Sequence, residues 1–423
     1  MLRSRISFIG LVAALCAAPL GAQEARVISL DDALRMFAED NLELRLTRSR
    51  ADQAAGLALQ AGAFPNPSLG ATHEPLSGGG SSYSETYLTA SQRFELSGSR
   101  GARTEEGAMR RDAAIQRIHA DSVRLAFDVK SAYVLALHAQ DRRSVTQRIT
   151  EVFREATRTA SERYEAGDIS RYARSRIRVE RARYETLLAD ADMEVGSAQR
   201  TLALLVAPGG EDIRLAAAPL PTPTPPPIPS RVFDLAVVEE RAELASARAE
   251  VDAEVARARL MRAERVPDLT ASGGFKRQSD GLRGVFLGLS IPVPFFDRGA
   301  GAVQAADAGL LAAEERLMLT RRQLQNDVLQ AVESFETLQR RSQLLSGEAM
   351  GEADDLLDIA LVAYEEGEME LLELLDAAAA LHGARTAESG LQTALWTAYY
   401  DLERAVGGFD DASAQSTTDP EIR

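Results

Sequence analysis

Residues 291–309, IPVPFFDRGAGAVQAADAG, change character in their middle. Ile291, Val293 and Phe295 alternate with prolines, which is typical of an extended strand that is about to end. The letters DRG follow at 297–299, and an alanine-rich run then favours a helix. The stretch therefore predicts a strand that leaves one environment, a turn, and a helix that enters another.

Similar landmarks occur twice along the chain, at a shift close to 200 residues. Residues 24–207 laid over 224–407 place Pro67 over Pro267, Gly101 over Gly301, and Tyr164-Glu-Ala-Gly167 over Tyr364-Glu-Glu-Gly367. A shift this constant indicates duplication of a unit of roughly 180 residues. We expect one repeat at 23–207 and a second at 230–407, joined by an extended proline-rich linker at 208–229.

Each copy is predicted to run helix, strand pair, long helix, turn, helix. Proline-free runs rich in Ala, Leu, Arg and Glu predict helices at 31–62 and 232–264. Alternating apolar and polar residues predict one β-hairpin at about 67–96 and another at about 268–295, each with one apolar face. Since strand signals of this kind are weak, a small soluble sheet is the alternative interpretation.

Two long helices are expected after the hairpins. Residues 101–164 and 301–364 contain no proline, and a run of about 60 helical residues would be about 90 Å long. The second run has a heptad seam of apolar residues: Leu317, Leu324, Val328, Ala331, Phe335, Leu338 and Leu345. After glycines at 167 and 367, helices are expected to resume at about 170–205, with Ser170 as the N-cap, and at 370–406. Helices this long must line or brace something extended.

The first 22 residues are typical of a secretory signal peptide. Arg3 and Arg5 precede an apolar run of about 13 residues, where roughly 20 are needed to span a bilayer, and cleavage is expected after Ala22. The single cysteine, Cys16, follows Leu15 where a lipoprotein signal would need a small residue, so lipidation is not expected. The mature chain then has no cysteine, which excludes disulfides and thiolate chemistry.

Composition and motifs also argue against several classes of function. The formal net charge of -15 argues against nucleic acid as a partner. The chain shows no HExxH or P-loop motif and its four histidines are scattered, so we expect no catalytic residues, no metal site and no cofactor. Residues 408–423 are expected to form a flexible C-terminal tail.

Together the landmarks resemble the TolC-type outer-membrane efflux family over nearly all of the mature chain. Residues 65–67, PNP, are similar to the entry from helix to strand in that family. Residues 94–100, FELSGSR, are similar to its exit from strand to helix, with Ser99 where the family usually has lysine. Residues 292–299 resemble its second exit, and the two Tyr-x-x-Gly motifs resemble its periplasmic tips. The entry and second-exit motifs lean toward the heavy-metal branch of the family.

The resemblance implies a mainly α-helical subunit with a transmembrane β part. Three subunits would each give four strands to a shared twelve-stranded barrel, and their helices would form a tunnel through the periplasm of a Gram-negative bacterium. The implied function is a passive, gated exit duct in the lipid of the outer membrane, without enzymatic activity. An inner-membrane pump, of the RND type, would deliver the cargo through a periplasmic adaptor. The alternative function is that of a periplasmic adaptor or coiled-coil scaffold.

The resemblance also assigns roles to the two tips, at about 164–171 and 364–376. Glu373 and Asp376 would ring the periplasmic aperture and Tyr364 would help to hold it closed. The spacing of three independently places both carboxylates on one helix face. Met369 stands where the best-known member has an arginine, so the closed state is not expected to use the same salt bridges.

Two further groups of residues at the tips are candidates, one for adaptor docking and one for holding the pore shut. Adaptor docking is implied for Gly167, Asp168 and Ser170 of the first tip and for Gly367, Glu368 and Glu370 of the second. The helix after the first tip carries a basic face that includes Arg171, Arg174 and Arg178. We hypothesise that this face pairs with the acidic stretch 365–376, between hairpins or between subunits, and holds the pore shut.

Overall fold

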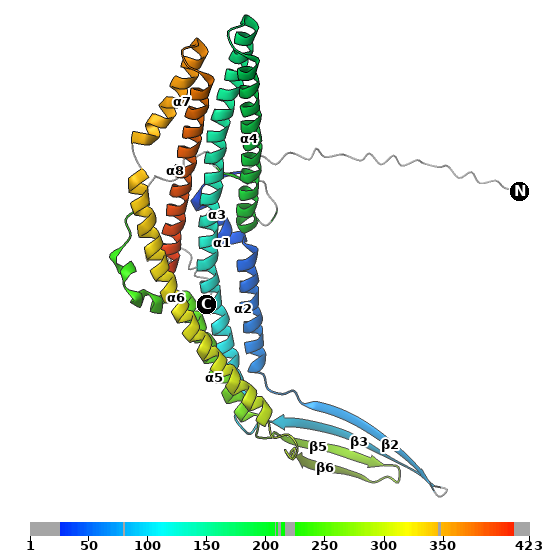
Figure 1. The fold of residues 1–423 in the computed structure, drawn as a ribbon. Helices are drawn as coiled ribbons and strands as arrows, with labels where there is room; N and C mark the ends of the chain where they lie inside the picture. The colour runs from blue at the N-terminus through cyan, green and yellow to red at the C-terminus, as the bar shows by residue number, and fades with distance from the viewer. Residues whose placement is uncertain are drawn as a thin grey trace, which may run out of the picture.

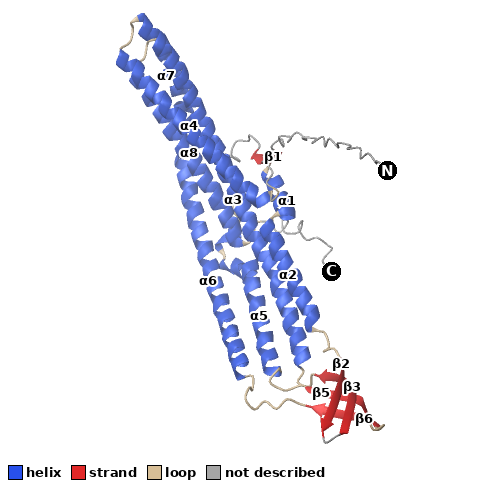
Figure 2. Ribbon diagram, turned by 90° about the vertical axis from the view of Figure 1, so that its right-hand side faces the viewer, coloured by secondary structure: helices blue, strands red, loops and turns tan. Residues whose placement is uncertain are grey.

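The molecule is a long bundle of helices with a small sheet at one end and two helical hairpin tips at the other (Figures 1 and 2). The computed structural model describes residues 26–78, 81–207, 209, 213–215, 225–345 and 348–409. The predicted leader, most of the linker and nearly all of the C-terminal tail lie outside these residues. Within them, no helix is both long and apolar enough to cross a membrane.

The helices follow the duplicated plan. In the first repeat they are α1 (Leu30–Asp40), α2 (Leu42–Ala61), α3 (Ser99–Ala166) and α4 (Arg171–Val206). In the second they are the 3-10 helices η1 (Ser230–Phe233) and η2 (Leu235–Glu240), then α5 (Ala242–Ala263), α6 (Ala300–Leu345), α7 (Glu348–Glu366) and α8 (Leu371–Val406). The α3 helix alone has 68 residues, or about 100 Å at the usual helical rise, and is slightly longer than the run of about 60 residues that the sequence predicted.

The sheet joins the two repeats. Strands β2 (Ser68–Gly78), β3 (Ser81–Phe94), β5 (Leu269–Gln278) and β6 (Arg283–Ser290) lie in the order β2-β3-β5-β6, and every neighbouring pair is antiparallel. The central pair β3 and β5 comes from different repeats, and its register runs from Glu85 opposite Gln278 to Phe94 opposite Leu269. The strands β2 and β6 are the edges.

One face of this sheet is apolar and exposed. Leu69, Leu88, Phe275, Val285, Leu287 and Leu289 all lie on it, and Leu287 is 91% exposed. The opposite face carries a cluster of hydrogen-bonded polar side chains. In it the Glu85 carboxylate accepts from the Lys276 ammonium at 2.8 Å and from the Gln278 amide at 2.7 Å. The sequence prediction of hairpins with one apolar face is confirmed.

A second, smaller sheet was not predicted. Strand β1 (Arg26–Ile28) pairs in parallel with β4 (Ile213–Leu215), and Ile28 enters the core around Phe37, Leu125 and Val206. This pairing ties the start of the first repeat to the segment that follows it.

Two predicted helices are interrupted in the structure. The run 31–62 divides at Asn41, whose side-chain oxygen caps α2 through the Leu44 amide at 2.8 Å while its amide donates to the Leu205 carbonyl at 2.8 Å. The run 232–264 is α-helical only from Ala242. The run 301–364 is described as α6 and α7, and residues 346 and 347 between them lie outside the described residues.

The strand bounds also differ from the expected ones. Strand β3 ends at Phe94 and β6 ends at Ser290, so Leu96, Ile291 and Val293 lie beyond the ladder. The prolines at 292 and 294 explain the second case because proline offers no backbone N–H to a neighbouring strand. Of the predicted seam in α6, Leu324, Val328, Ala331 and Phe335 are buried, whereas Leu317 and Leu338 are partly buried around them.

Candidate functional site

The end of the molecule opposite the sheet is formed by two hairpins with the same turn. Gly167 ends α3 with φ 86°, and Gly367 ends α7 with φ 79°, a backbone conformation that favours glycine. In the first turn the Asp168 amide donates to the Arg163 carbonyl at 2.8 Å, and in the second the Glu368 amide donates to the Ala363 carbonyl at 2.8 Å. The duplication therefore extends to individual hydrogen bonds.

The helices that leave the two tips begin with different caps. The Ser170 hydroxyl accepts from the Ala173 amide at 3.1 Å, as the sequence predicted. Glu370 is the N-cap of α8, and its amide donates to the Glu373 carboxylate at 3.0 Å, so these two acids form a capping box. The sequence placed Glu370 in the first turn but did not predict the box.

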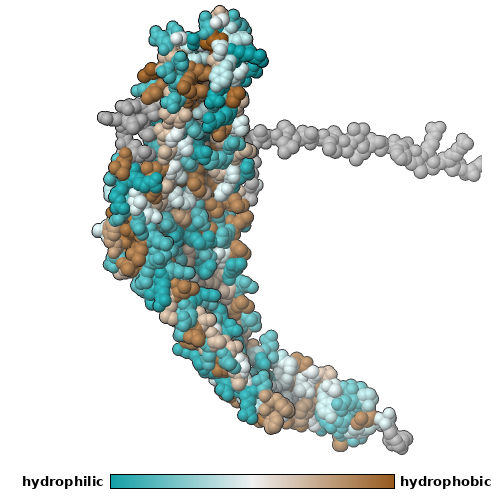
Figure 3. Space-filling view, in the orientation of Figure 1, coloured by the Kyte–Doolittle hydropathy of each residue, from teal (hydrophilic) through white to brown (hydrophobic). Residues whose placement is uncertain are grey.

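A shared apolar core fixes the two hairpins to each other. It contains Ile149, Val152, Phe153, Ala156, Ala160, Ile177 and Tyr184 from the first hairpin and Leu357, Ala360, Tyr364, Leu374, Ala377, Ala378 and Leu381 from the second. Met369 is half-buried against this core. On the face shown in Figure 3, hydrophobic residues lie among hydrophilic ones at this end of the helices.

The predicted gate residues fall into two groups. Glu373 and Asp376 are exposed, whereas Tyr364 is buried in the shared core, where burial raises the pKa of its hydroxyl. Asp168, Arg171, Arg178 and Glu368 are exposed, as are both turn glycines. Arg174 is half-buried, and its guanidinium lies 3.9 Å from the ring centre of Tyr164 in its own hairpin.

The two tips differ strongly in charge. Residues 161–178 carry five arginines and three acids, whereas the equivalent residues 361–378 carry six acids and no lysine or arginine. Within one subunit, Arg148 binds Asp358 at 2.8 Å and joins α3 to α7. Pairing of Arg171, Arg174 and Arg178 with the acidic tip stays a prediction.

Arg163 is a tip residue that the sequence argument missed. Its guanidinium donates to the Tyr364 carbonyl at 3.1 Å and lies 5.6 Å from the ring centre of the same tyrosine. Comparison of the two copies could have drawn attention to it, because the first copy has Arg163 where the second copy has Ala363. Arg163 thus ties the last turn of α7 to the last turn of α3.

We expect the substitution Arg163→Ala to loosen the second tip. Loss of one charged hydrogen bond of about 1.5–3 kcal/mol should raise amide hydrogen exchange at residues 364–369 by at least about tenfold. Arg158→Ala is the matched control, because Arg158 binds Glu155 and Glu162 of its own helix. Equal exchange in the two variants would contradict the role given to Arg163.

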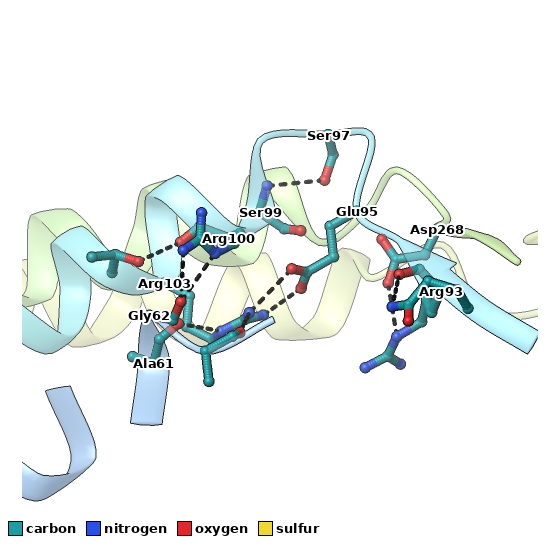
Figure 4. A network of polar contacts seen from close by, with 12 residues as sticks. Ala61, Gly62, Arg93, Glu95, Ser97, Ser99, Arg100, Arg103 and Asp268 are labelled. Carbon is teal, nitrogen blue, oxygen red and sulfur yellow. Dashed lines mark hydrogen bonds and ion pairs between the residues drawn. The ribbon is translucent and has the colours of Figure 1, made fainter. Parts of the chain in front are cut away.

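At the other end of the helices, a polar network fixes the first junction between sheet and helices (Figure 4). Arg103 binds the Glu95 carboxylate through two hydrogen bonds of 2.6 and 3.2 Å and donates to the Ala61 carbonyl at 2.9 Å. Arg100 donates to the Gly62 carbonyl at 2.8 and 3.0 Å. Two arginines at the start of α3 therefore satisfy the last carbonyls of α2.

The second junction is simpler. The Asp297 carboxylate accepts from the Gly299 amide at 2.8 Å, and the Arg265 side chain donates to the Arg298 carbonyl at 3.1 Å. Gly299 has φ 69°, so the DRG turn predicted from the sequence depends on its glycine. Among the described residues, no group of three or more His, Cys, Asp or Glu side chains could hold a metal ion.

These features define a class of protein: a duplicated helical shaft with a sheet at one end and paired hairpin tips at the other. The family model of the outer membrane efflux protein matches residues 33–207 and 236–408, and the chain belongs to that family. One matched segment covers most of the first repeat and the other covers most of the second.

Individual relatives agree with this placement. The chain is 26% identical to the cobalt-zinc-cadmium resistance protein CzcC of Cupriavidus metallidurans over 389 residues, which is 91% of each protein. It is 28% identical to the nickel-cobalt-cadmium resistance protein NccC of Alcaligenes xylosoxydans xylosoxydans over 271 residues, 63% of this chain and 61% of that one.

Solved structures share the fold. The Campylobacter jejuni CmeC outer membrane channel superposes with a TM-score of 0.76 over 100% of this chain and 99% of its own, at 15% identity. A crystal structure of CusC gives a TM-score of 0.72 over 90% of this chain and 92% of its own, at 17% identity. The TolC-like fold predicted from the sequence is confirmed.

Proposed function

We propose that three copies of this chain form a gated efflux duct that crosses the outer membrane and extends into the periplasm. The observation that carries the proposal is the four-stranded sheet, which has one exposed apolar face and two edge strands and continues into a helix of 68 residues. Open sheet edges cannot lie in lipid because their backbone groups would be unpaired. Pairing of β2 with β6 of a neighbouring copy closes the sheet.

The gate lies at the acidic tip in this proposal. Three copies of Glu373 and Asp376 form rings of carboxylates that favour cations and bind divalent ions. Tyr364 and Met369 hold α7 and α8 against the first hairpin through the shared core. In this proposal the basic face with Arg171, Arg174 and Arg178 pairs with the acidic tip of a neighbouring subunit.

The partners follow from the same arrangement. A periplasmic adaptor docks on the turns at Gly167, Asp168 and Ser170 and at Gly367, Glu368 and Glu370, and an RND-type inner-membrane pump delivers cargo through it. The relatives CzcC and NccC are named for resistance to cobalt, zinc, cadmium and nickel. Divalent heavy-metal cations are therefore the proposed cargo.

The cargo proposal predicts a resistance phenotype. A strain that lacks its own outer-membrane channel but keeps the cognate pump and adaptor should regain growth in cobalt, zinc or cadmium when this chain is expressed. The physical reason for this expectation is that the carboxylates of the acidic tip favour cations. The metal-resistance relatives support it by comparison. Restored resistance to organic drugs without any restored resistance to metals would contradict the assignment.

The duct itself is tested with the detergent-extracted wild-type protein. Native mass spectrometry should show a trimer, and insertion in a planar bilayer should give small cation-selective steps. A water-soluble monomer without conductance would favour the alternative, a periplasmic adaptor or scaffold.

A further inference from the structure

Two arginines lie directly opposite each other near the turn that joins β5 and β6. Arg277 of β5 pairs with Arg283 of β6, and both side chains are exposed. Among the residues that the structure describes, neither arginine forms an ion pair or a side-chain hydrogen bond. Like charges directly opposite each other destabilise a sheet, so an anion bound between them would remove an unfavourable repulsion. We call Arg277 and Arg283 the arginine pair.

The arginine pair lies on the exposed apolar face of the sheet. Side chains two residues apart along a strand point to the same face. Phe275 and Val285 are opposite each other, two residues away from the pair, and both belong to the apolar face. Lys276, which binds Glu85, lies on the opposite face. The two unpaired charges therefore belong to the surface that meets lipid in the proposed function.

The sheet itself supplies no acid to neutralise the arginine pair. The two acids within the described strands of this sheet, Glu74 and Glu85, are opposite each other on the other face. In the proposed function β6 pairs with β2 of a neighbouring copy, and the only acid of β2 is Glu74, which also faces away from the arginines. In the turn between the strands, the Asp280 carboxylate accepts from the Leu282 amide at 3.0 Å. The anion is therefore expected to come from outside the strands.

The position of the pair along the strands matches the outer boundary of a bilayer. The turn between β5 and β6 lies at the end of these strands that points away from the helices (Figure 1). The stretch of β6 from Leu289 to Arg283 is about 20 Å long at the usual rise of an extended strand. An arginine that faces lipid is costly at the midplane and nearly neutral at the interface. Since the helices extend into the periplasm in the proposed function, the pair lies at the headgroups of the outer leaflet.

We propose that the arginine pair binds the phosphate group of a phosphorylated lipid in the outer leaflet of the outer membrane. The inference rests on the proposed function, because it requires the apolar face of the sheet to lie in the bilayer. A guanidinium binds phosphate through two parallel hydrogen bonds, and two guanidinium groups on directly opposed residues can hold one phosphate between them. Lipid phosphate is favoured over free phosphate because Phe275 and Val285 offer an apolar surface to the acyl chains directly beside the pair.

The test removes the charges of the pair and leaves the strands in place. Arg277→Gln combined with Arg283→Gln is compared with the wild type and with the double lysine variant at the same positions. Arg316→Gln combined with Arg322→Gln is the matched control, because it removes two exposed arginines of α6. Each detergent-extracted protein is mixed with lipid A, whose sugar headgroup is phosphorylated, or with the same lipid after phosphatase treatment. Native mass spectrometry counts the lipids that each protein retains, and the melting temperature is measured with and without lipid.

We expect the wild type and the α6 control to retain one lipid A molecule per subunit. The glutamine variant should bind lipid A at least about tenfold more weakly, because the charge-assisted hydrogen bonds to phosphate are lost. The lysine variant keeps the charges without the paired hydrogen bonds and should bind with intermediate affinity. Without lipid the glutamine variant should melt no lower than the wild type, since the repulsion is gone, whereas lipid A should raise the melting temperature of the wild type alone.

Three results would overturn the lipid site and leave the duct intact. They are equal retention of lipid A by the wild type and the glutamine variant, equal retention of the phosphorylated and the dephosphorylated lipid, and binding of inorganic phosphate at the pair without retention of lipid A. A wild-type protein that neither forms a trimer nor inserts into vesicles would contradict the proposed function as well.

Discussion

The substitution Gly274→Val is expected to abolish the assembled protein. A Cβ atom at Gly274 would lie 2.2 Å from the Leu88 carbonyl oxygen and 2.7 Å from the ring of Phe286. The first contact is with the backbone of the neighbouring strand, so the strand itself must move. Because β3 and β5 are the only pair in the sheet that joins the two repeats, this clash separates the two hairpins.

The expected cost is at least about 3 kcal/mol, above the usual range for overpacking, because backbone is displaced. Heat-stable oligomer on a gel and the yield of membrane-inserted protein are the measurements. Gly70→Val is the matched control, since no atom lies within 4 Å of a Cβ built at Gly70 of β2. Normal assembly of Gly274→Val would contradict the register between β3 and β5.

The substitution Arg103→Ala should be the most destabilising charge removal at the first junction. The Glu95 side chain is 6% exposed and that of Arg103 is 29% exposed, so the variant leaves a nearly buried carboxylate without its cation. Breaking a buried pair in this way costs about 3 kcal/mol, at the lower end of the usual range because Arg103 is partly exposed. Arg111→Ala, which removes an exposed pair with Asp112, should cost less than about 1 kcal/mol.

The double variant Arg103→Ala with Glu95→Gln distinguishes a lost charge partner from lost packing. The neutral amide needs no cation, so the double variant should recover part of the stability lost in Arg103→Ala. The melting temperature of the detergent-solubilised protein measures each step. A double variant less stable than Arg103→Ala alone would show that Glu95 acts in another way.

The same pair predicts a pH dependence. The hydrogen bonds from Arg103 hold the pKa of Glu95 below its usual value. The folded protein therefore binds fewer protons at this carboxyl group than the unfolded chain does. The stability from this pair is complete above the unfolded pKa of about 4.3 and is lost as pH falls through the lower folded value. Arg103→Ala should therefore reduce the acid sensitivity of the melting temperature.

The sequence predicted the architecture because the duplication leaves marks at fixed spacing. Tyr164 and Gly167 recur as Tyr364 and Gly367, and the structure gives both tips the same backbone turn. The long proline-free run gave α3 nearly to its ends. The division at Asn41 was not predictable from propensity, since it depends on a hydrogen bond to Leu205, which is 164 residues away.

Contacts between the repeats were also beyond the sequence argument. The bond from Arg163 to Tyr364 joins residues 201 apart, and the pairing of β3 with β5 requires both repeats to be folded together. The acidic pair at Glu373 and Asp376 could be proposed from spacing alone, but the capping box of Glu373 with Glu370 depends on where α8 begins.

The central claim is that the acidic tips gate the duct, and single-channel conductance in a planar bilayer tests it most directly. Wild-type protein is compared with Glu373→Ala combined with Asp376→Ala, each with and without millimolar divalent ions. We predict a small cation-selective current in the wild type that divalent ions block, and loss of that block with a larger conductance in the double variant. Divalent block of equal strength in both proteins would contradict a gate at the acidic tips.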